Sequence, residues 1–253
     1  ETTWKFATGT NNGWGIKTDG TLWVWGLGQN GSLGLNEGGT IRYSSPTQVG
    51  TETTWATIAN GDGSQTTLGT KTDGTMWSWG YAGNGGLGQN NKTQRSSPTQ
   101  LGTDTSWSTD TSDPAAMQTC DVGVGCQFAI KADGTMWSWG FNSQGQLGRG
   151  ESPGNTNKSS PCQIPGTTWR SIHAQNQGPG SRSVFATKTD GTLYAWGSNT
   201  YGHLGQNNRT EYSSPRQIPG TTWTSTSYGL AEKGHSPRLK TDGTYWTWGQ
   251  NYM

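Results

Sequence analysis

Histidine and acidic side chains are the first candidates for catalysis, because a general acid or base must be a titratable group placed against the substrate. The chain has three histidines, His173, His203 and His235, and 16 acidic residues. None of the histidines recurs in a motif, and the sequence contains no GxSxG, HExxH or metal-ligand cluster. We therefore predict a protein that is not an enzyme and binds neither a metal nor a cofactor. His203 follows glycine in a polar stretch, and we expect its side chain to be exposed.

Glycine and cysteine give no stronger chemical signal. Stretches of the form W-G-x4-G-x-L-G lack the Lys-Ser/Thr pair of a phosphate-binding loop, and no helical pattern follows them. The three cysteines show no spacing that suits zinc. Cys120 and Cys126 could form a local disulfide in an oxidising compartment. Buried free thiols are at least as consistent with the odd count, which Cys162 completes.

A ten-residue phrase, KTDGTLWVWG at 17–26, recurs with small changes at 71–80, 131–140, 188–197 and 240–249. Asp-Gly between alternating apolar runs predicts a β-hairpin with a type I′ turn. Trp23 and Trp25 face one side of the second strand and Leu22 and Val24 the other, which predicts burial between two neighbouring sheets. The recurring turn and strand positions are Asp19, Asp73, Asp133, Asp190 and Asp242, and Trp25, Trp79, Trp139, Trp196 and Trp248.

Two further landmarks complete the repeat. The Trp-to-Leu spacing in W-G-x4-G-x-L-G is constant, which predicts a defined loop, and Ser-Ser-Pro with prolines 46, 98, 161 and 215 predicts short edge strands. Each unit is then about four short antiparallel strands, and successive turns lie 54, 60, 57 and 52 residues apart. The fold predicted is all-β, a β-propeller of five repeat units with its last blade incomplete. We expect one domain over 1–253, part of a longer chain, with units at roughly 1–50, 51–102, 103–166, 167–220 and 221–253.

The unit resembles the repeat of the regulator of chromosome condensation family, in which a glycine precedes the turn Asp by ten residues and W-G-x-N-x-x-G-Q-L-G follows the hairpin. Gly9, Gly63, Gly123 and Gly180 stand at the glycine position, and FNSQGQLG at 141–148 is close to the family pattern. The family histidine, seven residues before the Asp, is matched only by His235. The resemblance implies a propeller, while members of the family differ widely in function.

The tryptophans are best interpreted as scaffold. Fourteen of the 15 stand at landmarks of the repeat, and Trp14 occupies a position where other units have Leu or Phe. A light-sensing cluster, known in this family, would need a G-W-R-H-T type of segment, which this chain lacks. The lysine two residues before each turn Asp is expected to be a solvated residue at the strand end. These lysines are Lys17, Lys71, Lys131, Lys188 and Lys240.

Variable loops are the better candidates for binding, because repeats place equivalent loops side by side on one face. Cations before each Ser-Ser-Pro strand form either a loose ring or ordinary solubility charge; they are Arg42, Arg95, Lys158 and Arg209. Loop aromatics suit a protein or glycan partner; they are Tyr43, Tyr81, Phe141, Tyr201, Tyr212 and Tyr228. Insertions at 108–120 and 173–182 are expected to project at one end of the ring.

A net charge of +1 gives no general attraction to nucleic acid or anionic lipid, and no apolar run could insert into a membrane. Asn30, Asn91, Asn157 and Asn208 begin N-x-S/T triplets, as glycan sites or by chance. The polar composition resembles bacterial and phage surface members of the family. We expect an extracellular, cell-surface or virion module that contacts a protein, a glycan or further copies of itself. The alternatives are a small-GTPase exchange factor or chromatin-binding protein, an enzyme inhibitor and, last, a hydrolase.

Overall fold

The computed structural model describes residues 3–9, 12–61, 65–110, 119–151, 154, 156–175, 182–224 and 235–249. Tyr228 and most of the two insertions, at 111–118 and 176–181, lie outside these residues. The described chain is built from β-strands, with one 3-10 turn, η1 (Gly83–Gly85), and no α-helix. Within the same residues, no helix is long and apolar enough to cross a membrane.

Four antiparallel sheets of four strands follow one another along the chain, each with its strands paired in sequence order. Blade 1 comprises β1 (Trp4–Gly9), β2 (Asn12–Lys17), β3 (Leu22–Gly28) and β4 (Ile41–Gln48). Blade 2 comprises β5 (Trp55–Asn60), β6 (Thr66–Lys71), β7 (Met76–Gly80) and β8 (Arg95–Gln100). Blade 3 comprises β9 (Cys120–Val122), β10 (Cys126–Ile130), β11 (Met136–Gly140) and β12 (Lys158–Ile164). Blade 4 comprises β13 (Trp169–Ala174), β14 (Ser183–Lys188), β15 (Leu193–Gly197) and β16 (Tyr212–Ile218).

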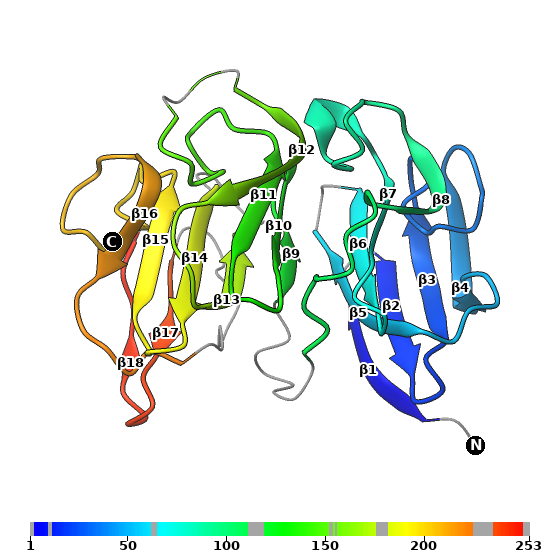
Figure 1. Cartoon of the computed structure of the whole chain (residues 1–253), viewed down its shortest axis with the longest axis horizontal. Helices are drawn as coiled ribbons and strands as arrows, with labels where there is room; N and C mark the ends of the chain where they lie inside the picture. The colour runs from blue at the N-terminus through cyan, green and yellow to red at the C-terminus, as the bar shows by residue number, and fades with distance from the viewer. Residues whose placement is uncertain are drawn as a thin grey trace.

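Blade 5 is a two-stranded sheet, β17 (Arg238–Leu239) and β18 (Tyr245–Trp246), joined by the last Asp-Gly turn. The five blades stand side by side along an arc, with the N-terminus at one end of the molecule and the C-terminus at the other (Figure 1). This arrangement confirms the all-β propeller with five units and an incomplete last blade. The Ser-Ser-Pro segments form β4, β8, β12 and β16, each on one edge of its sheet, as predicted.

The core lies between successive sheets, where large apolar residues of one blade meet tryptophans of the next. Trp79, Trp139 and Trp196 are all fully buried, at 0% exposure. One cluster joins Leu68 of blade 2 to Trp139 of blade 3, and another joins Phe128 of blade 3 to Trp196 of blade 4. Tryptophans at the two ends of the arc differ: Trp4 is 43% and Trp246 49% exposed. Tryptophans that face a neighbouring blade are therefore buried, as Trp14 of blade 1 is against Trp79 of blade 2, whereas those at the ends of the arc are partly exposed.

The Asp-Gly turns have a geometry that differs from the predicted type I′. In blade 1 the Gly20 N–H donates to Lys17 O at 2.9 Å and the Lys17 N–H to Thr21 O at 3.0 Å. Only the glycine has positive φ, +80°, because Asp19 is held instead by accepting the Thr21 N–H at 3.0 Å and the Thr21 hydroxyl at 2.7 Å. This is a type I turn followed by a glycine bulge, and the pattern recurs in all five hairpins. The threonine hydrogen bonds hold the pKa of each turn carboxyl below its ordinary value.

The repeated lysines are not the solvated residues that the sequence predicted. Each lies across two aromatic rings of its own blade. Lys71 is 5% exposed, with its Nζ 3.6 Å from the Trp77 ring centroid and 5.2 Å from that of Trp55. The lysine stem packs on the indoles while the ammonium faces their electron-rich surfaces, which is why the position favours lysine.

Candidate binding face

Each tryptophan of the Trp-Gly pair, from blade 2 onward, reaches back to the glycine loop of the preceding blade. The indole N–H of Trp79 donates to Ser32 O at 3.0 Å, and that of Trp196 donates to Gln146 O at 2.8 Å. The same contact joins Trp139 to Gly86 O at 3.0 Å and Trp248 to His203 O at 2.6 Å. We call this repeated contact between a glycine loop and the next blade the clasp. It explains the constant spacing of the loop, because the acceptor is always the seventh residue after the Trp.

The clasp has a second half, formed by the fourth strand of the following blade. Gly145 lies so close to β16 that a Cβ built on it would stand 2.7 Å from Ser213 Cα. The N–H of Gly150, further along the loop, donates to Ser213 O at 2.6 Å. Blades 1 and 2 repeat this geometry on Ser96 and Ser159. Glycine is therefore required at this loop position by close backbone approach as well as by positive φ.

His203 is buried, at 1% exposure, and the expectation that it is solvated was wrong. It stands at the clasp acceptor position, where Ser32 and Gln146 are also buried, at 2% and 0%. Its ring lies edge-on to Tyr201, with the centroids 5.6 Å apart. Three of the four residues at this position carry side chains, and all three are buried, so the burial of His203 follows from its place in the loop.

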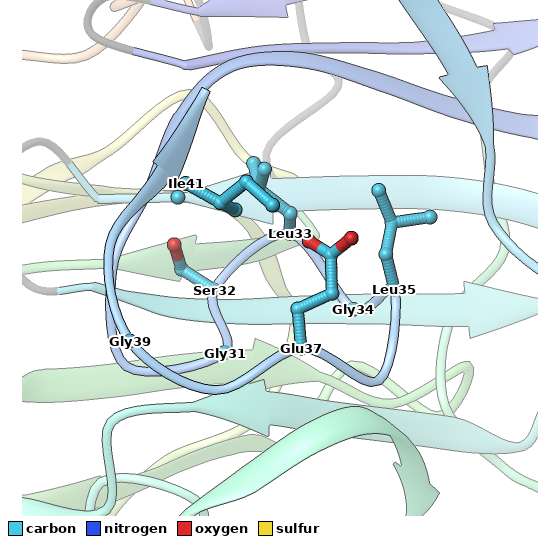
Figure 2. Close-up of a pocket in the computed structure, with 9 residues that line it drawn as sticks. Gly31, Ser32, Leu33, Gly34, Leu35, Glu37, Gly39 and Ile41 are labelled. Carbon is cyan, nitrogen blue, oxygen red and sulfur yellow. The ribbon is translucent and has the colours of Figure 1, made fainter. Parts of the chain in front are cut away.

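The space enclosed by a glycine loop is small. In blade 1 the loop surrounds a cavity of about 10 Å³, lined by Leu33, Leu35 and Ile41 and bounded by Glu37 (Figure 2). A cavity of this volume has room for about one water molecule. The loop therefore packs largely on itself and presents only its outer side chains for binding.

We define the loop face as the surface formed by the glycine loops 27–40, 81–94, 141–157 and 198–211, within the described residues. These loops lie at the end of each blade opposite to the Asp-Gly turns, because the strands on either side of them are antiparallel. Tyr81 is the most exposed aromatic here, at 46%. Phe141 is half-buried, and the Arg182 guanidinium lies 4.9 Å from its ring centroid.

The remaining predicted residues lie on or beside this face, most of them with partners. The Tyr43 hydroxyl donates to Glu37, and Asn208 donates to the Tyr212 hydroxyl at 3.0 Å. Lys158 pairs with Glu151 at 3.1 Å. By exposure, Arg42 and Arg209 are exposed, whereas Arg95, Lys158, Tyr43, Tyr201 and Tyr212 are half-buried. The cationic ring stays a prediction, and its lysine member has a neighbouring carboxylate.

Amide side chains join neighbouring loops across the face, a feature that sequence reasoning missed. Asn157 donates to Asn84 at 3.1 Å, and Gln144 donates to Glu211 at 3.2 Å. Asn30 donates to Gln65 in the same way between blades 1 and 2. Asn30, Asn84 and Gln144 each stand five residues after the Trp, and that shared position was the available signal.

The titratable groups of β9 and β13, Asp121 and His173, do not form a reaction site with other described residues. Asp121 accepts the Ala174 N–H at 2.7 Å and the Val122 N–H at 2.8 Å, and burial raises its pKa to about 6. His173 Nδ1 lies 3.8 Å from Asp121 Oδ2, and burial lowers the pKa of His173 to about 3. Among the described residues no group of three His, Cys, Asp or Glu could hold a metal ion. The arrangement ties blade 3 to blade 4 and leaves the carboxylate occupied by backbone.

The structure shows the surroundings of the cysteines and of the asparagines in the N-x-S/T triplets. All three cysteines are free, and burial raises the pKa of Cys120 and of Cys126 to about 12. Asn91 and Asn208 are exposed, and each accepts the N–H of the residue two positions later, Thr93 at 2.8 Å and Thr210 at 2.9 Å. Asn157 is half-buried and accepts the Asn142 N–H at 3.0 Å. These asparagines therefore shape loops, and glycosylation of any of them stays untested.

Comparison with known proteins identifies the repeat. The family described as "Regulator of chromosome condensation (RCC1) repeat" matches residues 19–66, 133–174 and 190–229, which is more than half of the chain. The E3 ubiquitin-protein ligase HERC2 of Homo sapiens is 26% identical over 237 residues, covering 91% of this chain and 4% of that protein. The ultraviolet-B receptor UVR8 of Arabidopsis thaliana is 27% identical over 214 residues, covering 85% of this chain and 45% of the receptor.

The fold is also similar to that of solved propellers. Prp20p of Saccharomyces cerevisiae, whose structure was described together with its binding properties to Gsp1p and histones, gives a TM-score of 0.71 at 20% identity. The match covers 94% of this chain and 56% of that one. The chain therefore spans about half the length, or less, of the relatives it matches. A likeness at this level of identity shows the fold alone.

Proposed function

This chain belongs to the regulator of chromosome condensation (RCC1) repeat family, and we propose that it is a non-enzymatic binding propeller that recognises a protein through its loop face. One observation carries the proposal: the clasp fixes the backbone of four loops while their outward side chains differ. The second residue after the Trp is the half-buried Leu27 in blade 1, the exposed Tyr81 in blade 2 and the half-buried Phe141 in blade 3, whereas blade 4 has the buried Ser198. Variation on a fixed frame is typical of a recognition surface.

The chemistry of the face favours a protein partner. Tyr81 and the Phe141–Arg182 stack place two aromatic anchors on adjacent loops, and Asn84 and Gln144 add amide groups on the same two loops. Aromatic and arginine side chains surrounded by hydrogen-bonding groups are the usual anchors of protein interfaces. Prp20p, described as binding Gsp1p and histones, shows that a related propeller engages proteins. A glycan partner stays a prediction that rests on the loop aromatics alone.

The experiment is chemical cross-linking of the chain in an extract of its source, followed by mass spectrometry. We expect one protein partner whose yield falls at least tenfold for the double variant Tyr81→Ala/Phe141→Ala. Thr72→Ala, an exposed change in an Asp-Gly turn at the opposite end of the blade, is the matched control and should leave the yield unchanged. Equal yields from all three proteins would contradict the loop-face proposal.

Two alternatives from the same family can be separated by the identity of the partner. A nucleotide-free small GTPase would favour an exchange-factor role, and loss of an enzyme's activity on binding would favour an inhibitor. Location outside the cell or on a virion is a further proposal, supported by the polar composition and tested by detecting the chain in the secreted or particle fraction. Turnover of any substrate that is abolished by changing a single loop acid or histidine would overturn the non-enzymatic assignment.

A further inference from the structure

The linkers between blades are of two kinds, and they differ at the position three residues before the tryptophan that follows each linker. Before blades 2 and 3 this residue is acidic, Glu52 and Asp104, whereas before blades 4 and 5 it is glycine, Gly166 and Gly220. The linkers with glycine read Pro-Gly-Thr-Thr and are one residue shorter. In both kinds the backbone N–H of the following tryptophan donates to the Asp-Gly turn of the preceding blade, which places all four linkers at the turn end of the blades.

Each linker acid pairs with the lysine of the blade that follows it. The Glu52 carboxylate lies 2.6 Å from Lys71 Nζ, and the Asp104 carboxylate contacts the Lys131 ammonium. Both lysines lie across two indole rings, so the carboxylate supplies the hydrogen-bond acceptor that the ring faces do not offer. Blades 2 and 3 therefore show how this fold accommodates a carboxylate beside the repeated lysine.

The lysines of blades 4 and 5 lack such a partner. Lys188 is half-buried, with its Nζ 4.9 Å from the Trp169 ring centroid and 5.0 Å from that of Tyr194. Lys240 is half-buried in the same way. Within the described part of the chain, neither ammonium has a carboxylate or another hydrogen-bond acceptor in reach. An ammonium group that is partly removed from water without an anion favours binding one.

The space left by the missing acid has two donors beside it. A Cβ built on Gly166 would stand 3.6 Å from Lys188 Nζ and 3.5 Å from Trp169 Nε1. Trp169 is only 3% exposed, and its indole N–H has no acceptor among the described residues. Blade 5 repeats the arrangement at Gly220, where the equivalent lysine and tryptophan nitrogens stand 3.2 and 3.8 Å away and the indole N–H is again unpaired.

A ligand carboxylate can use both donors, which the linker acids do not. The indole N–H groups of Trp55 and Trp107, in blades 2 and 3, are unpaired although an acid is present, because that acid is tied to the linker and reaches only the ammonium. A carboxylate that enters at Gly166 is not restrained in this way. It would accept one hydrogen bond from the ammonium and one from the buried indole.

The Pro-Gly-Thr-Thr linkers also carry backbone strain. Thr168 and Thr222, directly before the tryptophans, have φ of +64° and +68°, which is unusual for a β-branched residue. The equivalent Thr54 and Ser106 do not have positive φ. The strained turn thus occurs in both linkers that lack the acid and in neither of the two that carry it. Residues held in such conformations are concentrated at functional sites, including ligand-binding ones.

Loss of the two acids changes the charge at the turn end of the molecule. Linkers 50–54 and 102–106 with turns 71–75 and 131–135 hold four acids and two lysines, a net charge of −2. Linkers 165–168 and 219–222 with turns 188–192 and 240–244 hold two of each, a net charge of 0. Both acids of the second group are turn aspartates, which accept threonine N–H and hydroxyl groups. Blades 4 and 5 therefore repel an acidic partner less than blades 2 and 3.

We propose that the turn end of blades 4 and 5 binds an acidic segment of a partner protein through two carboxylate notches. Each notch consists of a linker glycine, the tryptophan that follows it and the repeated lysine; they are Gly166, Trp169 and Lys188, and Gly220, Trp223 and Lys240. An Asp or Glu side chain of the partner takes the place that Asp104 has in blade 3. Notches on neighbouring blades favour a segment with at least two acids, because linked contacts raise affinity. The site lies at the opposite end of the blades from the loop face and does not depend on that proposal.

A polypeptide is a better occupant than a small carboxylic acid or a second copy of the chain. Residues 165–168 and 219–222 are exposed, so a small acid bound there would leave much of its surface in water. In a second copy, Glu52 and Asp104 are already paired with lysines of their own chain. A partner with free acidic side chains has neither disadvantage.

The test uses a fluorescein-labelled peptide of glutamate residues, about twelve long, added to the purified 253-residue protein. We expect saturable binding by fluorescence anisotropy, with a dissociation constant on the order of 100 µM at low salt and weaker binding at physiological salt. Lys188→Gln/Lys240→Gln should weaken binding about tenfold. The matched control, Lys5→Gln/Lys92→Gln, has the same net charge and removes two exposed lysines outside the notches, so it should change the affinity by less than about twofold.

A second pair of variants adds an acid and leaves both notch lysines in place. Gly166→Asp puts a carboxylate of the chain into its own notch and should weaken peptide binding about threefold, because one of two linked contacts is lost. Thr103→Asp, in the exposed part of the linker before blade 3, adds the same charge and should have little effect. Circular dichroism and thermal melting must first show that the variants are folded as the wild type. If Gly166→Asp is not, the lysine variants decide.

Three outcomes would overturn the proposal. The first is the absence of saturable peptide binding to the wild-type protein. The second is equal weakening by the notch lysine variant and its charge-matched control, which would reduce the attraction to general electrostatics. The third is displacement of the peptide by citrate at the same concentration of carboxylate groups, which would assign the notches to a small acid.

Discussion

The interface between blades 3 and 4 and the interface between blades 4 and 5 have the same loop conformation and different degrees of completion. In the first, Trp196 is fully buried, Gly145 contacts Ser213 and the loop N–H of Gly150 has an acceptor. In the second, Trp248 is half-buried, and among the described residues the nearest atom to a Cβ built on Gly202 is Asn208 O at 4.0 Å. In blade 4 the loop is held by the Trp248 indole and by Asn199, which donates to Asn208 O and accepts the Leu204 N–H, both at 3.0 Å. The fourth strand adds burial and packing to a conformation that already exists.

The largest effect is expected when the indole is removed from each of these two clasps. Trp196→Ala should lower the free energy of unfolding by about 3–5 kcal/mol, because it removes a fully buried indole and leaves Gln146 O without its donor. Trp248→Ala should lower it by about half as much, because part of that indole is already in water. Urea denaturation followed by circular dichroism measures both. Equal losses would mean that the two interfaces are equally packed, against the structure.

The contact between Asp121 and the backbone of β13, in the interface between blades 3 and 4, can be tested through the pH dependence of stability. Burial raises the pKa of Asp121 to about 6 from 3.8, so between these values the folded chain holds a proton that the unfolded chain has lost. Stability from this group is therefore fully present below about pH 4 and is lost as pH rises through 6. The two pKa values imply about 3 kcal/mol in total.

Asp121→Asn removes the titration, and the contribution of His173 cancels in the comparison. We expect the free energy of unfolding of the wild type, relative to Asp121→Asn, to be about 3 kcal/mol higher at pH 4 than at pH 7. Denaturation of both proteins at several pH values gives this difference. A difference that does not change with pH would show that Asp121 is ionised throughout and compensated by the two backbone N–H groups.

A smaller difference in stability is expected between substitutions of Gly145 and of Gly202. Gly145→Asn forces a Cβ against the backbone of β16 and should lower the free energy of unfolding by about 1–3 kcal/mol. Gly202→Asn places the same Cβ in open space and should change stability by about 0.5 kcal/mol or less. Thermal melting followed by tryptophan fluorescence distinguishes these outcomes. A large loss at Gly202 would mean that another segment packs against this glycine in solution.

These contrasts mark what the sequence could predict. The turns, the tryptophan pairs, the fixed loop and the Ser-Ser-Pro strands depend on local spacing that recurs, so they were correctly placed. The predicted turn type was wrong, because Asp19, which accepts the Thr21 N–H, keeps a negative φ. The burial of His203 and the stacking of Lys71 were missed, because both depend on which other strand or blade faces the side chain.

The smallest predicted effect compares an interior lysine with the lysine at the open end. Lys71 is enclosed by Trp55 and Trp77, and its ammonium pairs with Glu52 at 2.6 Å, whereas Lys240 lies 4.8 Å from the centroid of the exposed Trp246. Lys71→Gln should lower the free energy of unfolding by about 1–2 kcal/mol and Lys240→Gln by about 0.5 kcal/mol, because the cation–π attraction weakens where water reaches the ring. Lys92→Gln, in an exposed loop, is the control and should be neutral in the same urea titration. If Lys240→Gln were as costly as Lys71→Gln, blade 5 would have to be covered in solution, and the open end would be the first feature of the structure to revise.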